Sequence, residues 1–272
     1  MKHRDLGVLD QDVLLFGGPY GNRQALDAVF ASAQAAGIPA DHVICTGDIV
    51  AYCGAPAACV AAVRASGCAV LAGNCEVQLA QGAPDCGCGF DEGTTCDRLS
   101  VAWYAYAQTQ LDVAERMWMA ELPDVLSFVH HGQRYGVLHG GVSDVARFIW
   151  ATDGEAVFAQ EWAALEAVTG PVDAVIAGHS GLPFVRQTTR GPWINAGVIG
   201  MPPHDGAPQT RFAVLRAGQV RIEALEYDVQ GACDDMTAAG LPSEYRDALK
   251  SGYWPSEDVL PAALRVAVSD RG

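Results

Sequence analysis

The sequence predicts an α/β fold in which two mixed β-sheets pack together between outer layers of helices, a four-layer α/β/β/α sandwich. In the first half of the chain, short apolar runs alternate with helical stretches, the β-α-β pattern that produces parallel strands and right-handed crossovers. Beyond residue 183, apolar runs separated by turn residues indicate antiparallel strands. Half of the 272 residues are hydrophobic, so the chain can bury a substantial core.

Glycine and proline mark the ends of the first repeats. The tight turn from Gly17 to Asn22 follows the first strand and opens a helix, which Gly37-Ile38-Pro39 ends. We expect, in chain order, a strand at 12–16, a helix to about residue 36, a strand ending at Asp48, a helix at 55–66 and a strand at 69–72.

Residues 81–100, rich in glycine and cysteine, interrupt this pattern, and a loop of that length is usually functional or disordered. The elements expected next are helices at 99–109 and 112–121, strands at 125–130 and 134–139, a helix at 154–169, a strand ending before His179, and strands at 184–188, 193–195, 211–215 and 220–227. We predict a main domain over residues 1–229 and a C-terminal helical tail or lobe over 230–272, where prolines interrupt the helical pattern.

The composition excludes several classes of partner. The net charge of -15 argues against nucleic acid, because 17 basic residues among 32 acidic ones provide little to neutralise phosphates along a duplex. No secretory leader is evident and no apolar run is long enough to cross a bilayer, so we expect a cytoplasmic protein without a membrane partner. Nine cysteines, an odd number, then favour reduced thiols over a disulfide framework.

Four predicted strands end abruptly in polar side chains. A β-branched run leads into Thr46-Gly47-Asp48, and Asn74, His139 and His179 follow three further strands. Open α/β sheets bind ligands at the carboxyl ends of their strands, so we expect these side chains to meet there. A carboxylate, an amide and two imidazoles form an oxygen and nitrogen ligand set for one divalent transition metal, Mn, Fe or Zn.

Taken in order, these strand ends resemble the motifs of the calcineurin-like metallophosphoesterase superfamily, over about residues 12–227. That family carries D-x-H, G-D, G-N-H-D/E, a lone His and G-H-x-H. The corresponding residues are Gly18-Pro19-Tyr20, Gly47-Asp48, Gly73-Asn74-Cys75-Glu76, His139 and Gly178-His179-Ser180-Gly181. The stretch from Asn195 to Pro202 is similar to the family's N-P-G-S-V-G-x-P turn. The resemblance implies hydrolysis of a phosphomonoester or phosphodiester.

The departures from the family pattern all fall on one of its two metal sites. The resemblance assigns the first ion to positions that are here Gly18, Tyr20 and Gly181, none of them a family ligand. It assigns the second ion to Asn74, His139 and His179, which are all present, and Asp48 stands at the bridging position. We therefore predict a mononuclear site.

Three residues are candidates for substrate binding. The turn at Gly18 opens a helix, and backbone N–H groups there are suited to a phosphate. Tyr20 is a candidate hydrogen-bond donor or, less favoured, a metal ligand, and equally a packing aromatic. Asn195 is a candidate for substrate contact, with stabilisation of its own turn an equal alternative.

Cys75 stands where the family has a histidine that contacts the phosphate. It is a candidate proton donor, nucleophile or additional metal ligand, and alternatively a small residue tolerated at that position. With Asp48, it completes the predicted catalytic pair. Glu76 is a second candidate for orienting Cys75 or a water, although a solvated acid at the helix start is favoured.

The remaining candidates have weaker patterns. A second soft metal is conceivable on four thiols, but buried or redox-labile cysteines are favoured; these thiols are Cys53, Cys86, Cys88 and Cys96. Five histidines are interpreted as surface or turn residues, with His204 an outside candidate for the site; they are His3, His42, His130, His131 and His204. Arg147 is a candidate phosphate ligand, with a solvated basic residue the commoner case.

We therefore predict a metal-dependent phosphohydrolase that acts on a small phosphorylated molecule. One alternative is a ligand or metal sensor on a phosphoesterase scaffold that has lost hydrolysis. Another is a metalloenzyme that depends on the Cys75 thiol.

Overall fold

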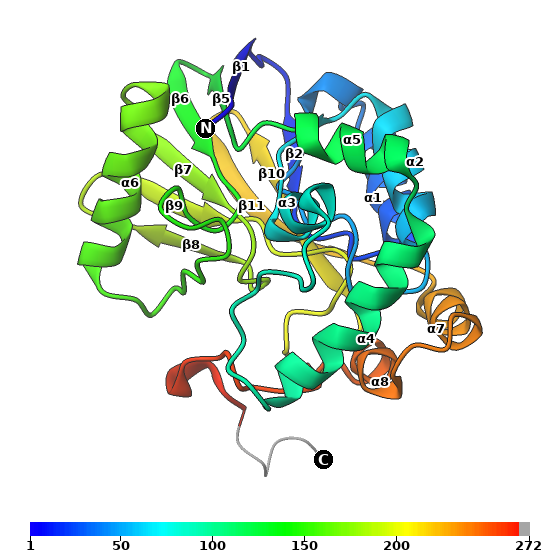
Figure 1. The fold of residues 1–272 in the computed structure, drawn as a ribbon. Coiled ribbons are helices and arrows are strands. Elements are labelled where there is room, and N and C mark those ends of the chain that lie inside the picture. The colour runs from blue at the N-terminus through cyan, green and yellow to red at the C-terminus, as the bar shows by residue number, and fades with distance from the viewer. Residues whose placement is uncertain (267–272) are drawn as a thin grey trace.

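The computed structural model describes residues 1–266, in which two β-sheets pack face to face with helices on both outer sides (Figure 1). One sheet has six strands, in the spatial order β1 (His3–Val8), β5 (Val125–His130), β6 (Gln133–Val137), β7 (Ala174–Ala177), β9 (Pro192–Asn195) and β8 (Phe184–Gln187). The other has five, in the order β11 (Gln219–Leu225), β10 (Thr210–Arg216), β2 (Val13–Phe16), β3 (Val43–Cys45) and β4 (Ala69–Val70). Both sheets contain parallel and antiparallel pairs, so the predicted sandwich of two mixed sheets is confirmed.

The helices of the described residues follow the sequence pattern closely. They are α1 (Arg23–Ala35), α2 (Pro56–Ser66), α3 (Asn74–Gln81), α4 (Thr95–Gln110), α5 (Val113–Glu121), α6 (Glu155–Thr169), α7 (Val229–Ala238) and α8 (Ser243–Ser251), with 3-10 turns η1 (Ala40–His42) and η2 (Ala262–Leu264). α4 begins four residues earlier than expected, because the Thr94 side chain caps it by accepting the N–H of Asp97 at 3.2 Å.

Three clusters of buried apolar side chains explain the stacking of the layers. Leu15 and Ile176 belong to the cluster between the two sheets, whereas Leu14, the next residue along β2, faces outward and packs in the same cluster as Leu26 of α1. This alternation is the two-residue period of a strand buried on both faces. On the other outer side, Trp162 of α6 packs against the six-stranded sheet.

β1 is an edge strand that the sequence analysis did not predict. It pairs in parallel with β5 only, and its side chains are exposed apart from a half-buried Leu6. An edge strand with both faces toward solvent shows no alternation of apolar and polar residues, so pattern alone does not reveal it.

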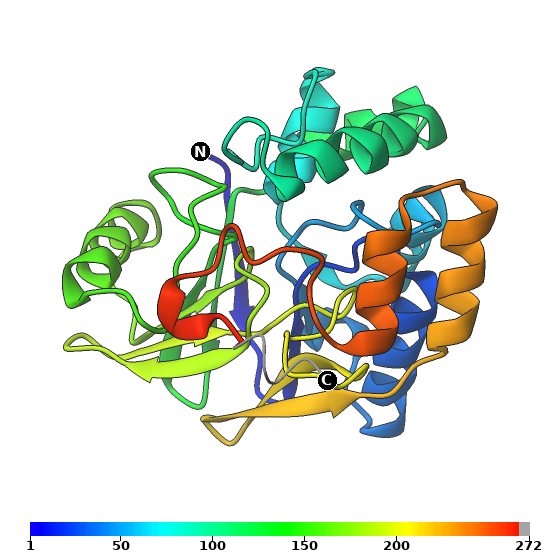
Figure 2. The ribbon, with the colours of Figure 1, turned by 90° about the horizontal axis from the view of Figure 1, so that it is seen from below.

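The C-terminal helices pack against the side of the fold that α1 covers. Met236 of α7 and Tyr245 of α8 are buried in the same apolar cluster as α1, and Gln24 of α1 donates to Asp235 Oδ2 at 2.8 Å. α7 begins at Val229, where the predicted boundary between domain and tail lies. Beyond α8 the chain crosses back toward β8 and β9, as Figure 2 shows.

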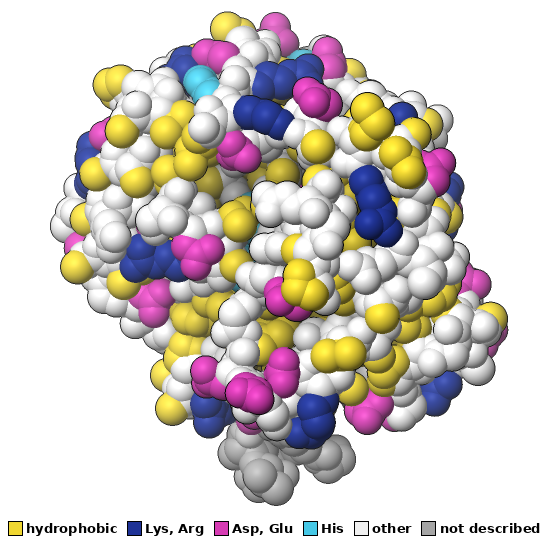
Figure 3. Space-filling view, in the orientation of Figure 1, with side chains coloured by type: hydrophobic (Ala, Val, Ile, Leu, Met, Phe, Trp, Pro, Cys, Tyr) yellow, Lys and Arg dark blue, Asp and Glu magenta, His cyan; other side chains and the backbone are white. Residues whose placement is uncertain are grey.

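Lys and Arg side chains are scattered in small groups among acidic ones on the face shown in Figure 3, with no extended basic stretch among the described residues there. Within residues 1–266, no helix has the length and apolar character needed to span a bilayer.

Candidate metal centre

The four predicted ligands lie together where the two sheets present the carboxyl ends of their parallel strands. Asp48 comes shortly after β3, and Asn74 begins α3 after β4, both in the five-stranded sheet. His139 and His179 each follow a strand of the six-stranded sheet, β6 and β7. The loops of both sheets therefore contribute to one site, as the strand-end pattern predicts.

The distances between the donor atoms fit a shared cation. His139 Nε2 lies 3.0 Å from His179 Nδ1 and 3.2 Å from Asn74 Oδ1. The same nitrogen lies 3.2 Å from Asp48 Oδ2. Two atoms bound at a right angle about 2.1 Å from one ion are about 3 Å apart, so these separations are typical of ligands around one metal. Among the described residues, Asp48, His139 and His179 are the one group of three acidic, histidine or cysteine side chains close enough to hold an ion.

Backbone contacts fix the orientation of the His139 ring. Its Nδ1 lies 2.6 Å from the carbonyl oxygen of Thr46, which requires Nδ1 to carry the proton and leaves the Nε2 lone pair facing the centre. The N–H of Gly178 donates to the carbonyl of His139 at 2.7 Å and so joins the two histidine loops. This second layer of contacts orders the ligands before any ion binds.

Three residues at the site have a backbone conformation that side chains rarely adopt. Asp48, His179 and Tyr20 have φ values of 56°, 57° and 53°. A left-handed conformation at a residue other than glycine costs about 1–3 kcal/mol and concentrates at functional sites. The fold therefore maintains this strain at two of the four predicted ligands.

The electrostatics of the centre favour an ionised carboxylate. Burial alone would raise the pKa of Asp48, but the adjacent His139 and His179 outweigh burial and lower the pKa below its usual value. The backbone N–H of Cys75, in the first turn of α3, also donates to Asp48 Oδ1 at 3.1 Å. For His179, burial lowers the pKa, so its imidazole is neutral and available as a ligand.

Glu76 is fully buried, so the expectation of a solvated acid is wrong. Its carboxylate accepts the backbone N–H groups of Asp48 at 2.7 Å, Ile49 at 2.8 Å and Gly73 at 2.9 Å. Burial, together with the neighbouring Asp48, raises the pKa of Glu76 to about 7. Glu76 therefore connects the loop that carries Asp48 to the start of α3, which carries Asn74.

Aromatic rings occupy the space beside the two glycines at the first-ion positions. A Cβ atom on Gly18 would lie 2.5 Å from Cζ of Tyr20, so the phenol ring covers this glycine directly. A Cβ atom on Gly181 would lie 3.2 Å from Cζ2 of Trp254. Tyr20 is buried, and burial followed by the charge of Asp48 raises its pKa well above the usual value, so its hydroxyl keeps its proton.

Gly18 and Asn195 have structural partners that occupy their polar groups. The N–H of Gly18 donates to the carbonyl of Gly47 at 3.1 Å and is not available to a phosphate. Asn195 Nδ2 donates to the Gly178 carbonyl and to Ser180 Oγ, both at 2.8 Å, and Oδ1 accepts the N–H of Gly197 at 2.9 Å. Asn195 therefore holds its own turn against the His179 loop, and its amide has no group left for substrate.

The Cys75 thiol lies beside the centre but is buried, with an exposed fraction of 1%. Burial raises its pKa well above the usual value, and the charges of Asp48 and Glu76 add to the effect. A protonated, enclosed thiol is a poor nucleophile. The structure thus gives Cys75 a packing position next to Asn74, whose Nδ2 lies 3.8 Å from its sulfur.

The structure does not gather the four thiols considered for a second metal. Cys86 and Cys88 are neighbours, with sulfurs 2.7 Å apart, and the amide of Asn74 donates to the Cys86 carbonyl and to the Cys88 sulfur. Cys53 instead contacts the carbonyl of Gly200, and Cys96 lies on the wall of the cavity that His179 borders. Cys86 and Cys88 of this loop thus contact Asn74, one of the four predicted ligands.

Four other predictions about polar side chains are corrected. His130 is buried beneath β1, where its Nδ1 lies 2.8 Å from the Leu9 carbonyl, and His204 is buried against Glu257 at 2.7 Å. Arg147 is not a free basic residue, because it pairs with the buried Glu161 at 2.5 Å. His42 is likewise buried, beside Asp41. The partners of His130 and His204 lie far away in the sequence, so local context does not indicate them.

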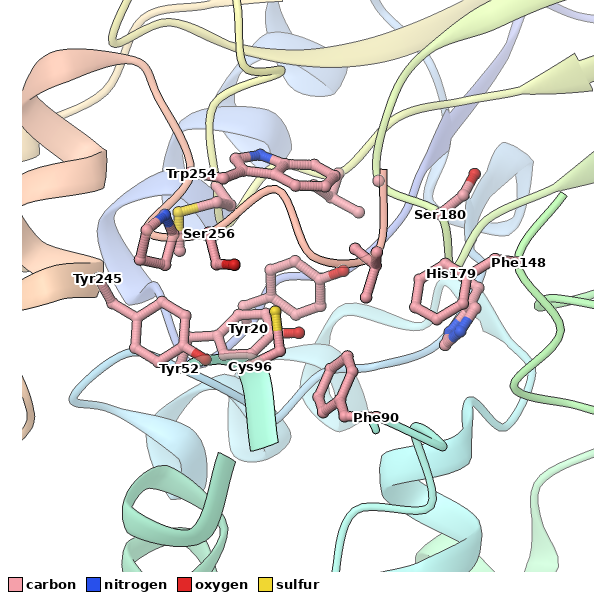
Figure 4. Close-up of a pocket in the computed structure, with 15 residues that line it drawn as sticks. Tyr20, Tyr52, Phe90, Cys96, Phe148, His179, Ser180, Tyr245, Trp254 and Ser256 are labelled. Carbon is pink, nitrogen blue, oxygen red and sulfur yellow. The ribbon is translucent and has the colours of Figure 1, made fainter. Parts of the chain in front are cut away.

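Two residues that the sequence analysis missed face the centre or its surroundings. The Phe148 ring packs on His179, with ring centroids 4.4 Å apart, and shields the imidazole. Trp254 lies in the cavity that His179 borders (Figure 4). Both lie outside helices and strands, where no periodic pattern indicates which residues are buried.

A model of the calcineurin-like phosphoesterase superfamily domain matches residues 21–219. The chain belongs to the calcineurin-like phosphoesterase superfamily. Among solved structures, a metallophosphoesterase from Sphaerobacter thermophilus superposes with a TM-score of 0.68 at 21% identity, covering 90% of this chain and 100% of that one. A hypothetical protein from Pyrococcus horikoshii superposes with a TM-score of 0.71 at 19% identity, covering 89% and 99%. No curated protein gives a significant match.

The family predicted from the strand-end motifs is thus confirmed. At these identities the two solved structures show a common phosphoesterase fold and nothing more specific. At the positions that the resemblance assigns to the first ion this chain holds Gly18, Tyr20 and Gly181, while Asp48, Asn74, His139 and His179 converge.

Proposed function

We propose that this protein is a metal-dependent phosphohydrolase that acts on a small phosphomonoester or phosphodiester through a single metal ion. The observation that carries the proposal is the approach of His139 Nε2 to donor atoms of Asp48, Asn74 and His179, within a chain of this superfamily. Mn, Fe and Zn all fit a set of two imidazoles and two oxygens. A divalent cation held there supplies Lewis acidity toward a phosphoryl oxygen and toward water.

The chain's own residues prepare the site for this chemistry. Thr46 sets the tautomer of His139, and Glu76 holds the Asp48 loop through three backbone hydrogen bonds. Phe148 covers one face of His179 and limits access of water from that side. The Tyr20 hydroxyl, which keeps its proton at neutral pH, is suited to donate a hydrogen bond to a phosphoryl group.

One observation favours a second function, that of a ligand sensor without turnover. Aromatic rings lie against Gly18 and Gly181, so this half of the site lacks the second charge that a two-ion site applies to the leaving oxygen. A protein of this kind would bind metal and a phosphoester but release the ester unchanged.

Metal content and turnover together test the proposal. We expect about one equivalent of metal per chain after loading with Mn, Fe or Zn, and hydrolysis of at least one member of a panel of small phosphoesters. His179→Ala should lose both the metal and the turnover. His3→Ala, which removes an exposed histidine of β1 that is not a predicted ligand, is the matched control and should keep both.

Two outcomes separate the rival functions. Saturable binding of an ester without hydrolysis by any metal form would reject the hydrolase and support the sensor. Cys75→Ala should keep its turnover, because the thiol is buried and protonated. Loss of turnover with normal metal content in that variant would instead assign the reaction to the thiol.

A further inference from the structure

A cavity opens directly beside the metal ligand His179. Its walls come from distant parts of the chain, with Tyr20 and Tyr52 on one side, Phe148 and His179 on the other, and Trp254 across the top in Figure 4. His179 thus belongs both to the metal centre and to the cavity wall. A molecule with its phosphoryl group at the centre has this cavity next to it for the rest of its structure.

The walls of the cavity are aromatic and carry no charged side chain. Tyr52 packs on Tyr20 and stacks on Tyr245, with ring centroids 4.6 Å apart in both pairs. Among the described lining residues there is no Lys, Arg, Asp or Glu, and the Ser256 hydroxyl, which lies below Trp254 in Figure 4, is a polar group of the wall. A charged substituent would lose its hydration there without gaining a partner.

Hydrogen bonds hold the far wall in place. Trp254 donates through Nε1 to the Pro202 carbonyl at 2.7 Å and through its backbone N–H to His204 Nδ1 at 2.8 Å. His204 in turn contacts Glu257 at 2.7 Å. The indole is therefore fixed at both its ring and its backbone, so this wall of the cavity is already in place without a ligand.

We infer that this cavity binds an uncharged aromatic group of the phosphoester, so that the protein selects esters of aromatic alcohols over aliphatic ones. The inference rests on the proposed function for its phosphoryl end. Its aromatic end follows from the walls, because rings of the ligand gain edge-to-face and stacked contacts with the tyrosines and the indole. Because His179 belongs to both the centre and the cavity wall, it fixes the orientation of the bound ester. The phosphoryl group lies at the metal and the aromatic ring lies in the cavity.

Two phosphonates of equal charge test the binding separately from the reaction. Benzylphosphonate and ethylphosphonate are resistant to hydrolysis and differ in the ring alone, so calorimetric titration of the metal-loaded protein measures what the cavity contributes. We expect benzylphosphonate to bind about tenfold more tightly, the scale for burial of one aromatic ring. Benzyl phosphate and ethyl phosphate, both esters of primary alcohols, provide the matching comparison of kcat/KM.

Two variants tie the preference to the cavity. Trp254→Ala should remove most of the benzyl preference, whereas Trp118→Ala, which removes a tryptophan from α5 outside the cavity, should keep it. Val259→Trp, which fills the cavity from its wall, should weaken benzylphosphonate binding and leave ethylphosphonate binding near wild type. This second variant decides the matter if Trp254→Ala does not fold.

The outcomes keep the two proposals apart. Equal affinity of the wild type for both phosphonates overturns the inference, even where both esters are hydrolysed and the proposed function stands. A full benzyl preference in Trp254→Ala or in Val259→Trp overturns it as well. Preferential binding of benzylphosphonate without hydrolysis of either ester rejects the hydrolase while supporting the aromatic cavity.

Discussion

Replacement of Glu76 tests how the site is held together. In Glu76→Gln the amide retains one oxygen, which can keep the two N–H groups that Oε2 accepts, from Asp48 and Gly73. The NH2 group then faces the Ile49 N–H, so one buried donor is left without an acceptor. An unsatisfied buried donor costs about 1–3 kcal/mol, and we expect the free energy of unfolding to fall by about that amount.

Glu76→Ala should cost more, because it leaves three buried N–H groups unpaired and opens a cavity at the start of α3; about 3–5 kcal/mol is the expected scale. Metal affinity should also fall by about 10- to 100-fold in both variants, the usual effect of losing a group that orients ligands. Urea denaturation of the metal-free protein and competition with a metal chelator measure the two effects separately.

Glu223→Gln, at an exposed position of β11, is the matched control and should change neither quantity. If Glu76→Gln unfolds at the wild-type urea concentration and binds metal as tightly as the wild type, the carboxylate does not organise the ligand loops and the reasoning fails.

Two further predictions concern the loop after His139 and the cavity wall. Burial alone would raise the pKa of Glu161, but hydrogen bonds from Ser143 and contact with Arg147 lower the pKa below 4.5. The ionised carboxylate therefore stabilises the folded protein above that pH, and this stabilisation is lost as the pH falls. Between pH 7 and pH 3, the free energy of unfolding should fall less in Glu161→Gln than in the wild type. Identical pH profiles would show that the Glu161 carboxylate does not stabilise the fold in this way. Gly181 has a φ of 76° and lies against Trp254, whereas Gly240 has a φ of 68° and lies in open space. Gly240→Ala should therefore carry only a backbone cost of about 1 kcal/mol, and Gly181→Ala should destabilise the protein by more. Equal destabilisation would show that the indole does not pack on position 181.

The convergence of the four predicted ligands could be read from the sequence because each follows a local signal. A run of apolar residues that ends in a polar one marks the carboxyl end of a strand, and parallel strands place those ends together without knowledge of any contact. Asp48, Asn74, His139 and His179 all carry this signal, and the structure brings them within contact of one another.

The environment of these ligands was not predictable in the same way. Glu76 accepts N–H groups from residues 27 and 28 positions earlier, so its burial depends on how two loops meet. Gly18 has the turn that the sequence predicts, but its N–H is donated to Gly47 across the parallel strands β2 and β3. Trp254 approaches the site from beyond α8, and no local pattern relates it to Gly181. Sequence periodicity reports which face of an element is buried, not which distant group covers it.

The position of Trp254 also separates part of the cavity wall from the four predicted ligands along the chain. The four donors are complete by position 179, whereas the indole that faces Tyr20 comes 75 positions later. Under the proposed function, substitutions after α8 are therefore a route by which evolution, or an engineer, can change the shape of the cavity without altering Asp48, Asn74, His139 or His179.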